Sequence, residues 1–152
     1  MDNSEFYNTA VESELKKNGV YASVTQGVSM RPLFKTHRDM IILKTPETEP
    51  KKYDVVLYKT RGEKFILHRI IKVLPDKFII RGDNTYVLEY VPKDTVLAVL
   101  TEFNRKGKRI TVENKLYKIY SFVWTNAYPL RYLVRRGLNL AGKIYRKLFK
   151  SK

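Results

Sequence analysis

Cysteine is absent from this chain of 152 residues, and histidine occurs only twice. The absence of cysteine excludes disulfide bonds, thiolate chemistry and zinc sites with cysteine ligands. Because only two histidines remain as nitrogen ligands, we expect no structural metal site, and nothing in the sequence indicates a cofactor.

A long apolar run is also missing. One of the longest uncharged stretches, residues 119–130, has only twelve residues and includes Asn126 and Pro129, whereas a membrane-spanning helix needs about 20 predominantly apolar residues. The N-terminus has no basic region followed by an apolar segment, as a secretory signal would. We therefore expect no signal peptide and no transmembrane helix, and a protein that is cytoplasmic or peripheral at a membrane.

Acidic residues are missing from the last quarter of the chain. Residues 115–152 contain ten Lys or Arg and no Asp or Glu, so ten of the fifteen net positive charges lie there and five are left for residues 1–114. A cationic segment of this kind favours anionic partners such as phospholipid headgroups, nucleic acid or an acidic protein surface.

What remains is a globular composition, with 43% hydrophobic residues and enough length for one domain with a core. Helical spacing over residues 4–17 predicts a helix that ends at Gly19. From residue 20 the apolar period changes to two, with β-branched and aromatic enrichment, which predicts a mainly β domain. The expected strands are 20–25, 39–44, 53–59, 64–74, 77–81, 95–103 and 109–112.

After Asn114 the apolar residues return to helical spacing. One stripe consists of Leu116, Ile119, Tyr120, Val123, Trp124 and Ala127; Pro129 should end or kink that helix. A second stripe, from Leu130 to Leu148, has basic residues mostly opposite it. These stripes indicate either a helix packed on the sheet or an amphipathic helix at a membrane interface. The expected layout is an N-terminal helix (1–19), a β-domain (20–113) and a basic helical extension (114–152), α+β overall.

Three short segments contain the side chains of a serine hydrolase. Ser29 follows an apolar strand, His68 lies inside another strand, and Asp83 belongs to a Gly-Asp-Asn turn. A serine hydroxyl needs a base within hydrogen-bond reach and donors for the developing oxyanion. Histidine suits the base, since its ordinary pKa is about 6.5. A carboxylate would fix its tautomer, and Asp83 and Glu89 are both near in sequence.

In order and spacing, these segments resemble the type I signal peptidases, above all their archaeal and endoplasmic-reticulum branch. The self-cleaving repressors of the same clan also carry a Gly-x-Ser-Met segment. The resemblance covers roughly residues 20–103 and implies a twisted, mostly antiparallel β-fold with its site in a groove at a sheet edge, where a bound peptide would add as an extended strand. The matching segments are Ser29-Met30-Arg31-Pro32, Tyr53-Asp54-Val55-Val56, His68-Arg69-Ile70 and Arg81-Gly82-Asp83-Asn84.

The resemblance also implies roles for single residues. Ser29 corresponds to the nucleophile and His68 to the general base. Asp83 and Glu89 compete for the third catalytic role, and we favour Asp83 as at least a structural member of the site. The family's hydroxyl two residues before the nucleophile is replaced by Gly27, so the oxyanion hole would consist of backbone N–H groups. The expected oxyanion or substrate-binding residues are Gly27, Val28, Met30, Pro32, Arg69 and Asn84.

The sequence therefore predicts a serine endopeptidase that cleaves a precursor, leader or signal peptide. That peptide would be one partner. An anionic membrane surface would be the other, and residues 115–152 would bind it. The alternative is a non-catalytic peptide-binding module whose basic tail binds a membrane or an acidic partner. Nucleic acid is not expected, because the chain has no base-stacking motif and no helix-turn-helix.

Overall fold

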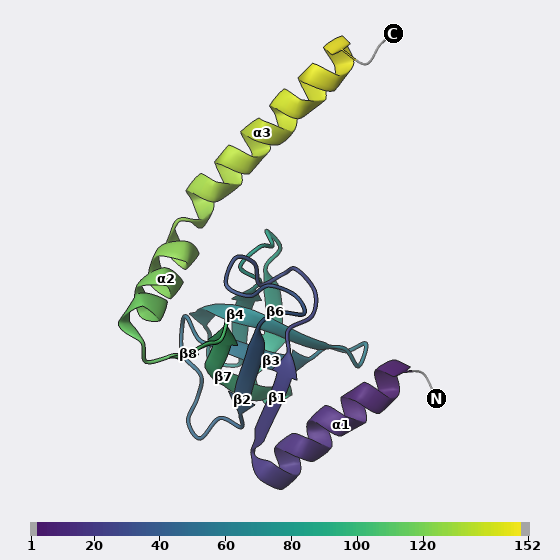
Figure 1. Cartoon of the computed structure of the whole chain (residues 1–152), viewed down its shortest axis with the longest axis vertical. Coiled ribbons are helices and arrows are strands. Elements are labelled where there is room, and N and C mark those ends of the chain that lie inside the picture. Colours follow the sequence, from purple (N-terminus) through teal and green to yellow (C-terminus); the bar gives the residue numbers. More distant parts are fainter. Residues whose placement is uncertain (1–2, 150–152) are drawn as a thin grey trace.

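Eight strands form one antiparallel sheet, and helices flank it at both ends of the chain (Figure 1). The computed structural model describes residues 3–149, with the side chains of residues 10–142. Within this range the fold is mainly β and α+β overall, as the sequence predicts. The helices are α1 (Asn3–Asn18), α2 (Lys115–Asn126) and α3 (Tyr128–Phe149), with a short 3-10 helix at Lys93–Thr95. The strands are β1 (Val20–Val24), β2 (Met40–Lys44), β3 (Val55–Lys59), β4 (Phe65–Val73), β5 (Lys77–Arg81), β6 (Glu89–Pro92), β7 (Val96–Arg105) and β8 (Lys108–Thr111).

The strand order leaves two edges unpaired near each other. The order is β1-β2-β7-β3-β4-β5-β6, with β8 also on β7. Among the described strands, β1 pairs only with β2. Strand β4 pairs with β3 over residues 65–69, but its pairing with β5 begins only at Arg69. Consequently, both β1 and the first half of β4 present backbone groups that another strand could pair with.

Two apolar clusters hold the sheet in place. The first lies under α1 and the loop after β1, and includes Val11, Met30, Phe34, Leu43 and Phe103. The second lies among β3, β4, β5 and β6, and includes Tyr58, Ile70, Phe78, Ile80 and Val91. Because side chains of a strand alternate between its two faces, the period-two pattern of the sequence supplies both clusters.

Strand β6 is the element that the sequence pattern does not predict. It has four residues and ends in Pro92, whose missing N–H makes it a poor strand residue except at an edge. Its pairing with β5 places Glu89 opposite Ile80. This pairing matters for the site described below, because it brings Glu89 to the end of β5 next to β4.

Helix α2 presents two different faces. Asn114 accepts hydrogen bonds from the N–H groups of Leu116 and Tyr117 and so caps the helix. Tyr117, Ser121 and Thr125 are buried against the β-domain. The predicted apolar stripe is divided, because its aromatic members contact the domain while Leu116, Ile119 and Val123 are exposed. None of the helices between residues 3 and 149 is long and apolar enough to cross a membrane.

Candidate active site

Ser29 lies in the loop that follows β1, at the end of a groove of about 1260 Å³. Gly27 has a φ of +73°, and an added Cβ would meet nothing within 4 Å, so this position needs glycine for its backbone conformation and not for space. The next side chain, Met30, is buried in the first apolar cluster. The serine is therefore held between a tight backbone turn and a buried anchor, with its own side chain in the groove.

His68 is oriented by Glu89. Its Nδ1 lies 2.8 Å from Oε1 of Glu89. The second oxygen of Glu89 accepts a hydrogen bond of 2.5 Å from the hydroxyl of Tyr58. His68 and Tyr58 are buried, whereas Glu89 is partly exposed. This contact leaves Nε2 as the ring nitrogen available for a reaction, which is the arrangement that a general base requires.

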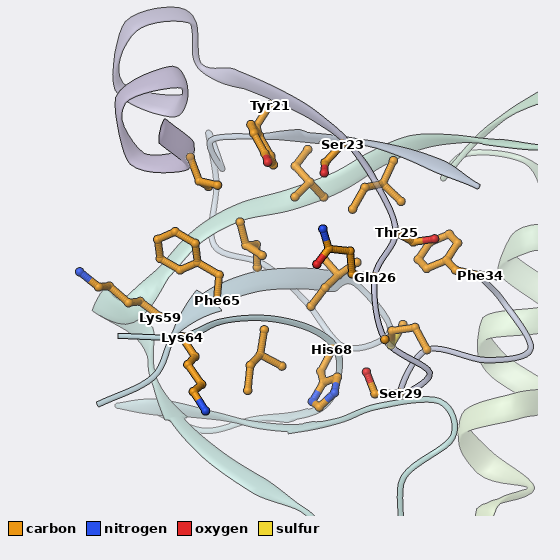
Figure 2. A pocket seen from close by; sticks show the side chains of 18 of the residues that line it. Tyr21, Ser23, Thr25, Gln26, Ser29, Phe34, Lys59, Lys64, Phe65 and His68 are labelled. Atoms are coloured by element: carbon orange, nitrogen blue, oxygen red, sulfur yellow. The ribbon is translucent and has the colours of Figure 1, made fainter. Parts of the chain in front are cut away.

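The other side of the His68 ring faces the Ser29 segment. A Cβ added to Gly82 would lie 2.7 Å from the carbonyl oxygen of Ser29 and 2.9 Å from Nε2 of His68. Both groups therefore approach the same buried glycine, and only glycine leaves room for them. Figure 2 shows the Ser29 side chain beside the His68 ring, at one end of the groove.

Asp83 serves a different partner. Its carboxylate forms two parallel hydrogen bonds, each of 2.8 Å, with Nε and Nη2 of Arg69. Both side chains are almost completely buried, at 0% and 3% exposure. Burial alone would lower the pKa of Arg69, but the Asp83 carboxylate outweighs it and raises the pKa, so the guanidinium is charged. The pair belongs to the framework behind the site.

Helix α2 completes this framework. Nη1 of Arg69 donates to Oγ of Ser121 over 2.8 Å and to the carbonyl of Tyr53 over 2.9 Å. The hydroxyl of Tyr120 donates to Asp83 over 2.9 Å. The indole of Trp124 donates to the backbone carbonyl of Asp83, also over 2.9 Å. These contacts fix the Gly-Asp-Asn turn from the side opposite the groove.

Asn84 connects this turn to the serine loop. Its backbone N–H donates to the carbonyl of Ser29 over 2.7 Å, and its side-chain amide donates to the carbonyl of Val28 over 3.2 Å. A displacement of the Asp83 turn would therefore displace Ser29 as well. The turn acts as a rigid link between α2 and the residue in the groove.

His68 is electrostatically suited to accept a proton. Burial lowers its pKa from the ordinary value, and the nearby Glu89 carboxylate opposes this only in part. The imidazole is therefore neutral at pH 7 and able to act as a base. Burial raises the pKa of Tyr58, and its hydrogen bond to Glu89 raises it further, so the phenol stays protonated and donates to the carboxylate.

Comparisons with known protein families, with curated proteins and with solved structures find no match to this chain. Among the described residues, no group of three His, Cys, Asp or Glu side chains is close enough to hold a metal ion.

The groove extends from Ser29 along the two unpaired strand edges. One wall is formed by β1 and the residues after it, up to Gln26, and the other by residues 64–68 of the β3–β4 hairpin (Figure 2). Apolar side chains dominate its lining, among them Tyr21, Leu57 and Phe65. Its far end reaches Val11 and Glu12 of α1.

Apart from Glu89, which contacts His68, the structure places the expected site residues in three groups. Ser29, His68, Gly27 and Met30 line the groove. Asp83 and Asn84 hold the serine loop from behind. The third group does not line the groove: Val28 and Pro32 are exposed, and Arg69, expected on the substrate side, is buried in the framework.

Sequence reasoning missed Tyr58 and the polar residues of α2. Val56 pairs with His68 across β3 and β4, so Tyr58, two residues further along β3, lies on the same face and diagonal to the histidine. That position could have been derived from the predicted hairpin. No sequence signal indicates that Ser121 contacts Arg69, because the two residues come from separate elements.

Proposed function

We propose that this protein is a serine endopeptidase that hydrolyses a peptide bond by Ser-His-Glu catalysis. The observation that carries the proposal is the orientation of His68, whose Nδ1 contacts Glu89 while Nε2 faces the Ser29 segment. If His68 served only to fill the core, the chain would not need a buried glycine at position 82. That glycine lets the Ser29 loop approach Nε2 of the histidine. The resemblance to the signal peptidases supports the same assignment of Ser29 and His68.

In the proposed reaction, Oγ of Ser29 attacks the carbonyl carbon of the scissile bond while Nε2 of His68 takes the hydroxyl proton. Backbone N–H groups around Ser29 hold the oxyanion of the tetrahedral intermediate. The intermediate collapses to a serine ester as His68 returns the proton to the leaving amine. A water molecule then attacks the ester, His68 takes its proton and gives it to Ser29, and the acid product leaves. Throughout, Glu89 keeps the proton on Nδ1 and stabilises the imidazolium.

The substrate would be an extended segment of a precursor, leader or signal peptide. A groove between two unpaired strand edges accepts a strand, because backbone hydrogen bonds are then available on both of its sides. The apolar lining supports apolar or small side chains on the peptide. The scissile bond would lie at the Ser29 end of the groove, because Ser29 and His68 line it there.

The test is incubation of the wild-type chain with a diverse peptide library, followed by mass spectrometry of the products. We expect cleavage at a defined sequence, with none by Ser29→Ala or His68→Ala. His37→Asn is the matched control, because His37 is exposed and its φ of 58° is readily adopted by asparagine.

The two variants also separate catalysis from binding. Peptides that bind to wild type and to Ser29→Ala with equal affinity, and are never cleaved, would favour a non-catalytic peptide-binding module. Cleavage that persists in Ser29→Ala would refute the proposed nucleophile.

A further inference from the structure

The beginning of α3 contacts the β-domain through its polar and aromatic side. Tyr128 donates a hydrogen bond to the carbonyl of Tyr86 over 3.2 Å, and the guanidinium of Arg135 lies 4.8 Å from the centre of the Tyr86 ring. Arg131 stacks over Trp124 and donates to the carbonyl of Asp83 over 3.0 Å. These contacts fix the rotation of the helix about its axis, at least over its first two turns.

As a result, the apolar side of α3 faces away from the domain. Leu130, Leu133 and Leu138 are 66%, 64% and 68% exposed. Beyond its first turns the helix extends away from the β-domain (Figure 1). In a helix of a globular protein the apolar side normally packs on the core and the charged side faces water. Here the two sides are reversed.

The exposed apolar residues of α2 continue the same surface. Leu116, Ile119 and Val123 are 76%, 59% and 52% exposed. Within each helix, intervals of three and four residues keep these exposed residues on one side, and Ala127 alone separates the two helices. We name this surface the outer face; it consists of Leu116, Ile119, Val123, Leu130, Leu133, Val134 and Leu138.

The charge around the outer face indicates what covers it. Residues 115–152 contain ten Lys or Arg and no acidic residue. Within the described side chains, these cations are Lys115, Lys118, Arg131, Arg135 and Arg136. A second copy of the chain would bring two such cationic segments together, which Coulomb repulsion opposes. An anionic lipid surface offers both an apolar interior and negative headgroups.

We propose that α2 and α3 bind the surface of an anionic membrane through the outer face. The apolar side chains enter the boundary between headgroups and acyl chains, and the Lys and Arg side chains of residues 115–152 that do not contact the β-domain reach the headgroups. The β-domain, attached to the opposite side of the helices, then stays in water with its groove accessible. Residues 150–152 lie outside the described residues, and Leu148 is among those whose side chains are not described. The proposal does not depend on the peptidase activity.

Two neighbouring positions of α3 provide a matched test. Leu138 belongs to the outer face, whereas Asn139 lies with Tyr86 and Arg135 on the side that faces the domain. Both side chains are exposed, so Leu138→Glu and Asn139→Glu add the same charge without altering the core. Flotation of the full chain would be measured with vesicles of phosphatidylcholine alone and with added phosphatidylglycerol.

We expect wild type to float with the phosphatidylglycerol vesicles and to remain free of phosphatidylcholine alone. Leu138→Glu should weaken the binding about tenfold or more, and Asn139→Glu by about twofold or less. Equal effects of the two substitutions would contradict membrane contact through the outer face. Wild-type binding that does not depend on phosphatidylglycerol would contradict the proposal as well. Absence of vesicle binding, together with a dimer in sedimentation that Leu138→Glu dissociates, would assign the surface to a second copy instead.

Discussion

At the scale of single residues, the two acids of the site are distinguished by their partners. Glu89 contacts the histidine, while Asp83 neutralises a buried arginine. The sequence could not separate them, because they lie six residues apart in one turn and strand. Pairing of β6 with β5 decides the matter, since it returns Glu89 toward β4. Ser29 and His68, in contrast, were recognisable from local motifs, because each motif lies within a single loop or strand.

The first prediction follows from the different partners of Glu89 and Asp83. Glu89→Gln should lower kcat/KM by about 10²- to 10⁴-fold with little effect on folding, because the base loses the group that fixes its tautomer. Asp83→Asn should instead destabilise the fold by about 3–5 kcal/mol, because it leaves Arg69 charged and buried. Peptide cleavage and urea unfolding of the two variants would be measured side by side. If Asp83→Asn lost activity with little effect on folding and Glu89→Gln unfolded more easily, Asp83 and not Glu89 would be the third catalytic residue.

The second prediction concerns pH. Burial lowers the pKa of His68 below its ordinary value of 6.5, so the neutral base persists at pH 6.5 and activity should decline only below it. In the unfolded chain this histidine binds a proton more readily. Its neutral form therefore contributes stability in full above pH 6.5, and this contribution is lost as the pH falls through the folded-state pKa. NMR titration of His68, assigned with His37→Asn, checks the direction; a pKa above 6.5 would contradict it.

The third prediction uses the close approach at Gly82. Gly82→Ala places a methyl group 2.7 Å from the Ser29 carbonyl and 2.9 Å from Nε2 of the buried His68 ring. We expect a loss of about 1–3 kcal/mol in unfolding free energy and of about 10²-fold in kcat/KM from displaced groups. Gly137→Ala, which meets nothing within 4 Å, is the control and should lower neither. Unaltered cleavage by Gly82→Ala would show that this approach is not needed.

At the scale of elements, α2 belongs to the framework of the site and is more than the start of a basic tail. The sequence predicted its helical spacing but not which side would be buried. Apolar spacing favoured Leu116, Ile119 and Val123, whereas the buried face is built from Tyr117, Ser121 and Thr125. Hydrogen bonds to Arg69 and Asp83 outweigh apolar burial here, and such partners cannot be read from the helix alone.

The fourth prediction compares two hydroxyls on that buried face. Oγ of Ser121 accepts from Arg69, whereas Oγ1 of Thr125 is buried and has no hydrogen-bond partner within the described structure. Ser121→Ala should therefore cost about 1–3 kcal/mol, because a charged donor loses its acceptor. Thr125→Val should be neutral or stabilising, since it removes an unsatisfied group and keeps the shape. Thermal unfolding would measure both, and equal losses would mean that α2 acts through packing alone.

At the scale of the whole molecule, curvature of the sheet creates the groove. Strands β2, β7 and β3 stand between β1 and β4 in the sheet order, yet β1 and β4 line the same cavity. Register shifts in the pairings of β2 with β7, β3 with β7 and β4 with β5 are the bulges that bend the sheet. Period-two patterns predict strands but contain no information on such shifts, so only the resemblance to the signal peptidases, and not the pattern itself, led us to expect a groove at a sheet edge.

The last prediction tests how this groove holds its substrate. If a peptide pairs with both free edges, its backbone N–H groups near the scissile bond are donors to β1 or to residues 65–68 of β4. Methylation of one such nitrogen should lower kcat/KM about threefold to tenfold per lost hydrogen bond, whereas methylation at a terminus beyond the groove should have no effect. A series of singly methylated versions of one cleaved peptide would locate the affected positions. Losses at alternate residues only would mean pairing with one edge, because successive N–H groups of a strand point to opposite sides. Tolerance at every position would refute binding as a strand and leave side-chain pockets as the sole source of affinity.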